Sequence, residues 1–404
     1  MKYIVILKKG YNRDSLTDYC TKVGKPCELH NLVIINTDEC TAKIIADLDC
    51  VESIEKDSVC TSDEEFYKSS RTTDNWALTR FNFTEPQREY PESYRYNRTG
   101  KGVGIYVIDS GVRTTHQELV GRVETIYSTL EGKHFDSDNE LNINRSHGTA
   151  VASAAAGKKL GIASEATVYN LFVDFSMSDI IKAFDTVLHH YKKSKSAAVL
   201  VTSFSTLSLA MKPISDALYQ AGLVHVSSAG NQSTDTPRYP AAFPQTISVG
   251  ATDKQDNKAS FSNFGNTVDV YAPGVNVKVA DHARDVRTRI ARGTSFSAPY
   301  VAGIIALMLE GSDKPRKSEH VDTIRQSFLD NAASASKADK RVPHTRFDIE
   351  PFKFPKPSPV EKIVQKVSDN KESSTISDKG SKKNYVKEIV AGVILVATIA
   401  AILL

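Results

Sequence analysis

The sequence predicts an α/β protein whose main unit is built on a mainly parallel sheet and follows a small α+β unit. Within residues 76–350, short apolar runs alternate with helical patterns, as in parallel sheets covered by helices on both faces. Residues 1–60 show a shorter order of strand, helix, strand, helix and strand. With 404 residues, 40 % of them hydrophobic, the chain is long enough for two or three units with a sizeable core.

The small N-terminal unit is predicted from its own periodicities. Lys2–Lys8 (KYIVILK) alternates between apolar and polar residues like a strand. Four further elements are expected, in the order helix, strand, helix, strand, at Asn12–Val23, Glu28–Asn36, Glu39–Leu48 and Val51–Asp57. Residues 61–75 are polar and lack periodicity, so we expect an exposed connector that a protease can cut.

The main unit is expected to contain at least five buried strands. They are predicted at Gly104–Ile108, Thr167–Val173, Ala197–Val201, Leu223–Ser227 and Thr246–Val249. Two helices matter for the site, one at Val151–Ala156 and one at Tyr300–Glu310, where Pro299 is suited to the first helical turn.

The C-terminal part has a different composition. Residues 351–388 are rich in Pro, Ser and Lys and are expected to form a flexible tether. Residues 389–404 form an uninterrupted apolar run of 16 residues. As a helix this run spans about 24 Å, slightly short of a hydrocarbon core of about 30 Å, and the preceding Tyr385, Val386 and Lys387 can extend it. A membrane anchor is expected here, and a buried core helix is the alternative.

Charge and cysteine usage exclude little. The formal net charge is +3, from 51 basic and 48 acidic residues, which gives no argument for nucleic acid as a partner. All five cysteines lie in the first 60 residues, so the main unit cannot depend on disulfides. The apolar run Tyr3–Leu7 is too short for a secretory signal, so we expect either a cytosolic protein or a different true start.

Three residues on separate local motifs are candidates for chemistry. Asp109 ends a predicted strand, where reactive groups gather in open α/β sheets; alone, it also fits a turn residue. His147 precedes a helix of small residues in SHGTA, and alone it also fits an ordinary surface or core histidine. Ser295 lies in GTSFSAP before a helix, where helix amides help to bind an oxyanion. The alternative for Ser295 is a helix N-cap, a role for which Ser297 competes.

Taken together, these motifs resemble the subtilase family, most closely its proteinase K-like branch, from about Trp76 to Gly311. The resemblance rests on VIDSG at 107–111, HGT at 147–149, SAGN at 228–231 and GTS at 293–295, in the family's order. It implies a subtilisin-like three-layer fold and a serine endopeptidase in which Asp109, His147 and Ser295 form the catalytic triad. Asn231 would supply the oxyanion-hole amide. Activity is expected to fall below about pH 6.5, where the imidazole becomes protonated.

Substrate-binding and metal positions follow from the same resemblance. The substrate-binding residues would be Ser205, Thr206, Leu207, Tyr239, Pro240 and Ala241. A structural calcium ion, not required for catalysis, would be held by Pro244, Thr246 and Asp269, because oxygen ligands suit a hard cation.

The sequence departs from the family pattern at three places. Ala150 stands where the family has a second histidine, Leu207 stands where it has a glycine, and the loop after Val173 is about four residues shorter than in proteinase K. Narrower acceptance of the residue before the scissile bond is therefore expected.

Residues 1–60 resemble the subtilase propeptide, a small ferredoxin-like α+β domain, through YIVILK at 3–8 and VESIEKD at 51–57. The resemblance implies a chaperone and inhibitor whose C-terminal tail occupies the substrate groove and is cut in cis within about residues 61–72. A permanent small domain is the alternative.

Membrane side and activity leave alternatives open. Lys382, Lys383 and Lys387 precede the apolar run and place the protease on the cytosolic face. Glycosylation sequons at Asn82, Asn97 and Asn144 favour the secretory pathway instead. A membrane-tethered pseudoprotease and a standalone inhibitor fused to an anchor are the competing functions.

Overall fold

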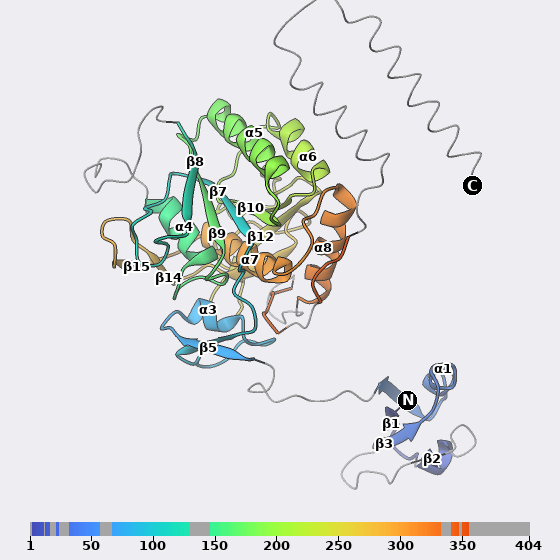
Figure 1. The fold of residues 1–404 in the computed structure, drawn as a ribbon. Coiled ribbons are helices and arrows are strands. Elements are labelled where there is room, and N and C mark those ends of the chain that lie inside the picture. Colours follow the sequence, from blue (N-terminus) through green and yellow to red (C-terminus); the bar gives the residue numbers. More distant parts are fainter. Residues whose placement is uncertain are drawn as a thin grey trace, which may run out of the picture. The chain divides into compact units, whose positions relative to one another are not determined.

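The computed structural model describes residues 2–11, 13–16, 22–23, 32–56, 67–129, 146–332, 341–346 and 350–354. The chain forms two compact units (Figure 1). Unit 1 comprises Met1–Arg71 and Arg95–Asn97, and unit 2 comprises Thr72–Tyr94 and the chain from Arg98 onward.

Unit 1 contains a four-stranded antiparallel sheet in the order β2-β3-β1-β4. Its elements are β1 (Lys2–Leu7), η1 (Arg13–Leu16), β2 (Lys22–Val23), β3 (Leu32–Asn36), α1 (Glu39–Ala46) and β4 (Val51–Lys56). Alternate residues of β1, namely Tyr3, Val5 and Leu7, are buried and share a core with Ile45 of α1. The alternation in the sequence therefore marks the buried face of this strand correctly.

One predicted element of unit 1 is wrong. Among the described residues of the expected helix Asn12–Val23, only Arg13–Leu16 is helical, as a 3-10 turn. Lys22–Val23 is a strand that pairs with Ile35–Asn36 of β3. Pairing with a distant strand overrides the local helical pattern here.

The expected strand Glu28–Asn36 is described only from Leu32 onward, where it forms β3. Two of the five cysteines, Cys40 and Cys50, lie in described segments, and both are free thiols.

Unit 2 is built on a seven-stranded sheet in the order β13-β12-β11-β10-β7-β9-β8, and all of its neighbouring strands are parallel. These strands are β7 (Gly104–Asp109), β8 (Val123–Ser128), β9 (Thr167–Phe172), β10 (Ala198–Thr202), β11 (Val224–Ser228), β12 (Thr246–Thr252) and β13 (Val270–Pro273). The parallel sheet predicted from the sequence is confirmed.

Helices cover both faces of this sheet, which makes three layers (Figure 1). The helices of unit 2 are α3 (Trp76–Arg80), α4 (Ser146–Ala156), α5 (Met177–Lys193), α6 (Lys212–Gln220), α7 (Thr294–Leu309) and α8 (Ser318–Asp330), of which the short α3 lies beside β14. On one face, Tyr106 and Ile108 of β7 share a core with Phe184 and Val187 of α5. On the other face, α4 and α7 pack against each other and against the strands. Two small sheets pair β5 (Ser69–Thr72) with β6 (Ser93–Tyr96) and β14 (Val277–Ala280) with β15 (Thr288–Ala291).

The helix α7 differs from its prediction at its start. It begins at Thr294 rather than Tyr300, so Pro299 lies inside the helix. Gly293 precedes the helix with φ 141°, a conformation that favours glycine. All residues of α7 are buried, which makes it a central helix of the unit.

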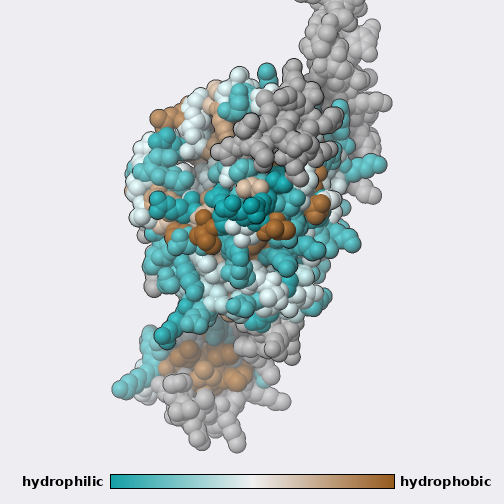
Figure 2. Space-filling view, turned by 90° about the vertical axis from the view of Figure 1, so that its left-hand side faces the viewer, coloured by the Kyte–Doolittle hydropathy of each residue, from teal (hydrophilic) through white to brown (hydrophobic). Residues whose placement is uncertain are grey.

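The surface and the helices of the described segments bear on the predicted membrane span and on the predicted glycosylation sites. On the face of unit 2 shown in Figure 2, hydrophilic residues predominate and the hydrophobic ones form small, separate patches. Among the described segments, no helix has both the length and the apolar character needed to cross a bilayer. The predicted span at residues 389–404 lies outside those segments. The sequon at Asn82 is only 2 % exposed, so a glycan cannot be accommodated there in the folded protein.

Candidate active site

Asp109 and His147 meet at the carboxyl end of the parallel sheet. Asp109 is the last residue of β7 and is fully buried, and His147 lies in the first turn of α4. The Nδ1 atom of His147 lies 2.9 Å from both carboxylate oxygens of Asp109. The backbone N–H of Ser110 donates to Asp109 Oδ1 at 2.7 Å. The carboxylate is therefore held in place and directed at one nitrogen of the ring.

The pKa of the His147 imidazole reflects opposing influences. Burial lowers it, whereas the charge of Asp109 and its hydrogen bond to the ring raise it, and the positive charge of Arg289 lowers it again. The net effect is a pKa above the ordinary value of 6.5.

Ser295 occupies the first turn of α7, and it is Gly293 that stands at the N-cap. The alternative role of Ser295 as a helix cap is therefore wrong, and Ser297 instead donates to the carbonyl oxygens of Ala272 and Pro273. In this structure, the Ser295 hydroxyl donates to the carbonyl oxygen of Ser203 at 3.3 Å.

Pro299 leaves the backbone carbonyl of Ser295 without its usual helical hydrogen bond. A proline has no N–H to donate to the carbonyl four residues earlier, which here is that of Ser295. The Ser203 hydroxyl donates to this carbonyl oxygen at 2.9 Å. Ser203, which directly follows β10, thus donates its hydroxyl to the backbone carbonyl of Ser295 and accepts the Ser295 hydroxyl at its own carbonyl.

Asn231 and the backbone of Ser295 border one small space. The side-chain oxygen of Asn231 accepts from the N–H of Thr294 at 2.9 Å and from its hydroxyl at 3.0 Å. These contacts leave the amide nitrogen of Asn231 to face elsewhere. A methyl group placed on Gly293 would lie 3.5 Å from that nitrogen and 3.7 Å from the backbone nitrogen of Ser295. The two nitrogens therefore lie within 4 Å of the same point beside Gly293, and two such N–H donors close together can stabilise an oxygen atom.

The ring of Phe296 joins the histidine to the serine motif. Phe296 follows Ser295 directly, and its ring centroid lies 5.7 Å from that of His147. The three candidate residues thus come from β7, α4 and α7 and gather at one end of the sheet.

The two segments predicted to bind substrate lie side by side. Thr206 and Tyr239 exchange two backbone hydrogen bonds of 2.8 Å each. Ser205 is partly exposed, and Pro240 and Ala241 are buried. The side chain of Leu207 is 62 % exposed, so it does not fill a buried pocket beside this strand pair.

The contacts of Asp269 do not fit the calcium ion predicted at Pro244, Thr246 and Asp269. One carboxylate oxygen of Asp269 lies 2.6 Å from the Arg325 guanidinium, and the other accepts from the Ser248 N–H at 2.9 Å. A calcium ion would have to displace Arg325 and lie close to its charge. The metal site remains a prediction, and these contacts argue against it.

Several residues at the site were not predicted from the sequence. Thr294 lies inside the GTS motif and Phe296 directly follows it, so the residues within and next to this motif are the signal that would have found these two. Ser203 lies two residues before the segment predicted to bind substrate, and no pattern in the sequence singles it out. Arg289 and Arg325 interact with His147 and Asp269, which are far from them in the chain, so no local sequence pattern predicts these interactions.

The sequence and the fold are similar to those of known proteins of one family. Residues 100–353 match the subtilase family, which contains peptidases of the S8 type. The alkaline protease 1 of Aspergillus oryzae is 30 % identical over 69 % of this chain and 68 % of its own length. The cuticle-degrading serine protease of Arthrobotrys oligospora is 29 % identical over 77 % of this chain and 81 % of its own length. A cold-adapted subtilisin-like serine proteinase of known structure has 27 % identity and a TM-score of 0.60, covering 68 % of this chain and 98 % of that one.

Proposed function

Since this chain belongs to the subtilase family and is a subtilisin-like serine endopeptidase, we propose that Asp109, His147 and Ser295 are its catalytic triad. Its substrates are proteins or peptides. The observation that carries the assignment is the pair of 2.9 Å contacts between the buried Asp109 carboxylate and His147. They hold Nδ1 to the carboxylate and leave the other ring nitrogen for a hydroxyl.

The proposed mechanism proceeds through an acyl-enzyme. His147 takes the proton of the Ser295 hydroxyl as its oxygen attacks the substrate carbonyl, and then gives that proton to the leaving amine. Asp109 keeps the ring in the required tautomer and stabilises its charged form. In this structure the hydroxyl donates to the carbonyl of Ser203, so this hydrogen bond must break before His147 can take the proton. Such contacts often tighten only when substrate binds.

We assign the side-chain amide of Asn231 and the N–H of Ser295 to the oxyanion hole. Asn231→Ala should lower kcat by about 10²–10³ with little change in KM, because the lost hydrogen bond forms mainly in the transition state. An unchanged kcat would remove Asn231 from the mechanism.

A fluorophosphonate probe tests the assignment of Ser295 directly. The processed protein should be labelled at Ser295, whereas Ser295→Ala should not be labelled and should have no peptidase activity. Absence of labelling in the processed wild type would favour the pseudoprotease that only binds or scaffolds.

We propose that the protein is made as a zymogen whose N-terminal unit inhibits it until cleavage. Support comes from the resemblance of residues 1–60 to a propeptide and from the separate core of unit 1. If processing is autocatalytic, Ser295→Ala should accumulate as the full-length precursor. Normal processing of that variant would show that another protease makes the cut.

We propose, from the sequence, that residues 389–404 attach the enzyme to a membrane. The support is the uninterrupted apolar run and the lysines that precede it. Full-length protein should stay in the membrane fraction after alkaline carbonate extraction, and a variant lacking residues 389–404 should be released. Protease protection and deglycosylation then distinguish the cytosolic side from the secretory pathway. Release of the full-length protein would overturn the anchor.

A further inference from the structure

The hairpin of β14 and β15 brings a guanidinium next to the proposed triad. Arg289 lies on β15, and its Cζ atom is 5.8 Å from the ring centroid of Phe296. The same ring lies beside His147 and follows Ser295 directly. Arg289 is also close enough to His147 for its charge to lower the pKa of the imidazole. Arg289 and His147 therefore lie beside the same aromatic ring, next to the proposed catalytic groups.

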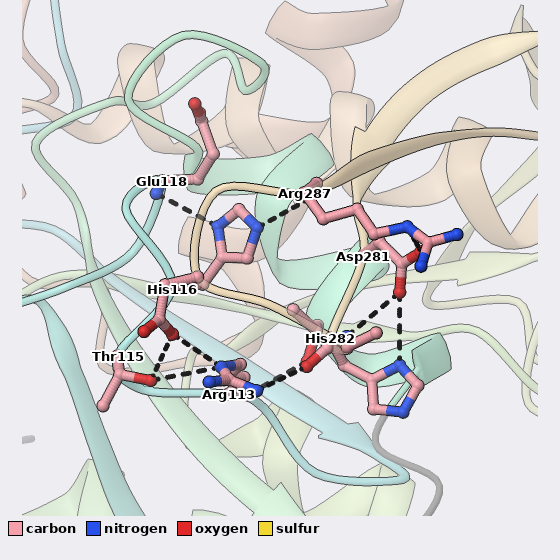
Figure 3. A network of polar contacts seen from close by, with 10 residues as sticks. Arg113, Thr115, His116, Glu118, Asp281, His282 and Arg287 are labelled. Atoms are coloured by element: carbon pink, nitrogen blue, oxygen red, sulfur yellow. Dashed lines mark hydrogen bonds and ion pairs between the residues drawn. The ribbon is translucent and has the colours of Figure 1, made fainter. Parts of the chain in front are cut away.

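A polar network fixes this hairpin relative to the triad. Figure 3 shows Arg113 and its neighbours facing the hairpin. The Arg113 side chain lies 2.6 Å from the carboxylate of Asp285 and donates to the carbonyl of His282 at 2.8 Å. The Arg113 N–H donates to the hydroxyl of Thr149, which lies on the helix of His147. The hairpin is thus tied to both the loop after Asp109 and the helix α4, so the position of Arg289 is well defined.

The charge of Arg289 is not neutralised by the described part of the chain. Both acidic residues of the hairpin are already paired, Asp285 with Arg113 and Asp281 with Arg287. Within the described ranges, Arg289 has no ion-pair partner, and its buried Nε atom has no hydrogen-bond partner. The side chain is partly exposed. A planar guanidinium with unused donors is suited to binding a carboxylate from a substrate.

The position of Arg289 indicates which part of a substrate it meets. A general acid that protonates the leaving amine lies next to the first residues of the leaving segment. The imidazole of His147 borders that path, the ring of Phe296 lies beside the imidazole, and the guanidinium of Arg289 lies over this ring. The segments expected to bind the acyl part, Ser205–Leu207 and Tyr239–Ala241, form a separate strand pair.

We propose that Arg289 is a specificity-determining residue that binds an acidic side chain at the first or second position after the scissile bond. This inference rests on the proposed function of the triad. It assigns to the enzyme a preference for substrates that carry aspartate or glutamate just beyond the cut.

Internally quenched peptides test the preference. A common peptide is made with Asp, Asn or Lys at each of the two positions, and kcat/KM is measured at low and at high salt. At low salt, the wild type should cleave the Asp peptide about 3- to 10-fold better than the Asn peptide, because an ion pair in partial contact with water is modest. High salt should reduce this ratio.

Three variants separate charge from structure. Arg289→Gln should bring the Asp-to-Asn ratio close to 1, Arg289→Glu should favour the Lys peptide, and Arg289→Lys should keep part of the acidic preference. The matched control is Arg284→Gln, an exposed residue of the same hairpin, which should keep the full ratio.

The outcomes are distinguishable. Cleavage of all peptides without an acidic preference, or a preference that persists in Arg289→Gln, would overturn the role of Arg289 and leave the protease intact. Failure to cleave any peptide, together with no fluorophosphonate labelling, would instead overturn the proposed triad. If Arg289→Gln does not fold, the Asp-to-Asn ratio is still tested by its salt dependence in the wild type and by its value in Arg289→Lys. A ratio that does not change with salt would then overturn the role of Arg289.

Discussion

The imidazole of His147 is balanced between a carboxylate and a guanidinium. Asp109 raises its pKa through a charge and a hydrogen bond, and Arg289 and burial lower it, with a net shift upward. A general base works only when it is neutral, so this balance sets the acid side of the activity profile. The sequence motifs alone placed that limit near pH 6.5, because they contain no information about the buried carboxylate contact.

We expect kcat/KM to fall as the pH decreases through a value above 6.5. The sign follows from the raised pKa, since His147 then stays protonated, and inactive as a base, up to a higher pH. Arg289→Gln should move the midpoint further upward, because it removes a charge that lowers the pKa. The measurement is the pH dependence of kcat/KM on a peptide without ionisable side chains. A wild-type midpoint below 6.5, or a downward shift in Arg289→Gln, would contradict this prediction.

At the scale of elements, the bounds of most strands of the main sheet could be predicted from the sequence, whereas the start of helix α7 could not. Five of the seven strands of the main sheet were predicted to within a few residues, because a buried parallel strand is a continuous apolar run bounded by polar residues, whereas β8 and β13 were missed. The start of α7 was missed because Pro299 was interpreted as a start signal. The carbonyl that Pro299 leaves free is satisfied by Ser203, which is 92 residues away in the chain. The residues of the proposed triad could be named from the sequence because each lies in a local motif, whereas partners such as Ser203 depend on packing.

The helix α8 is attached to the sheet by an ion pair, and we expect this to make calcium unnecessary. Arg325 contacts Asp269, which directly precedes β13. Both side chains are partly exposed, so the pair is modest, and Arg325→Ala should lower the melting temperature by about 2–4 °C, or about 1 kcal/mol. A chelator should not change the melting temperature of the wild type.

The experiment uses fluorophosphonate-inactivated enzyme, so that self-digestion does not distort the transition. Lys317→Ala, an exposed change beside the same helix, is the control and should have little effect. A clear loss of stability on chelation, restored by added calcium, would revive the predicted metal site.

At the scale of the whole molecule, the segment that follows the connector is tied to distant parts of unit 2. The side-chain amide of Asn75 donates to the carbonyls of Leu160 and Lys278 and to the hydroxyl of Tyr300. These partners lie 85, 203 and 225 residues away in the chain. The N-terminal part of the catalytic unit is therefore integrated into its core and is not a loose extension.

The ion pair between Arg80 and Asp256 continues this attachment, and breaking it should be costly. Both side chains are almost fully buried, and two nitrogens of Arg80 contact the two carboxylate oxygens at 2.9 Å and 2.5 Å. Arg80→Ala leaves a buried carboxylate without its partner, so we expect a loss of about 3–5 kcal/mol in the free energy of unfolding. Urea denaturation of inactivated enzyme measures it.

The double variant Arg80→Met with Asp256→Asn removes both charges and should recover much of this loss. Asparagine tolerates the positive φ of 60° at position 256. A double variant as unstable as Arg80→Ala would show that packing of the arginine stem, and not the unpaired charge, carries the effect.

The strand pairing of residues 69–72 narrows the range of positions at which the proposed zymogen is cut. The sequence predicted a cut within residues 61–72, but Ser69–Thr72 is strand β5, paired with β6, and the N–H of Lys68 donates to Asn97 at 2.7 Å. A protease needs an extended segment that is free of such pairing, so we expect the new N-terminus at or before residue 67. Mass spectrometry of the processed protein identifies this N-terminus.

The Ser295→Ala precursor, cut by added active enzyme over a time course, separates the first cut from later trimming. A first cut within residues 69–75 would mean that this strand pairing opens before processing, and the attachment described here would then form only in the mature enzyme.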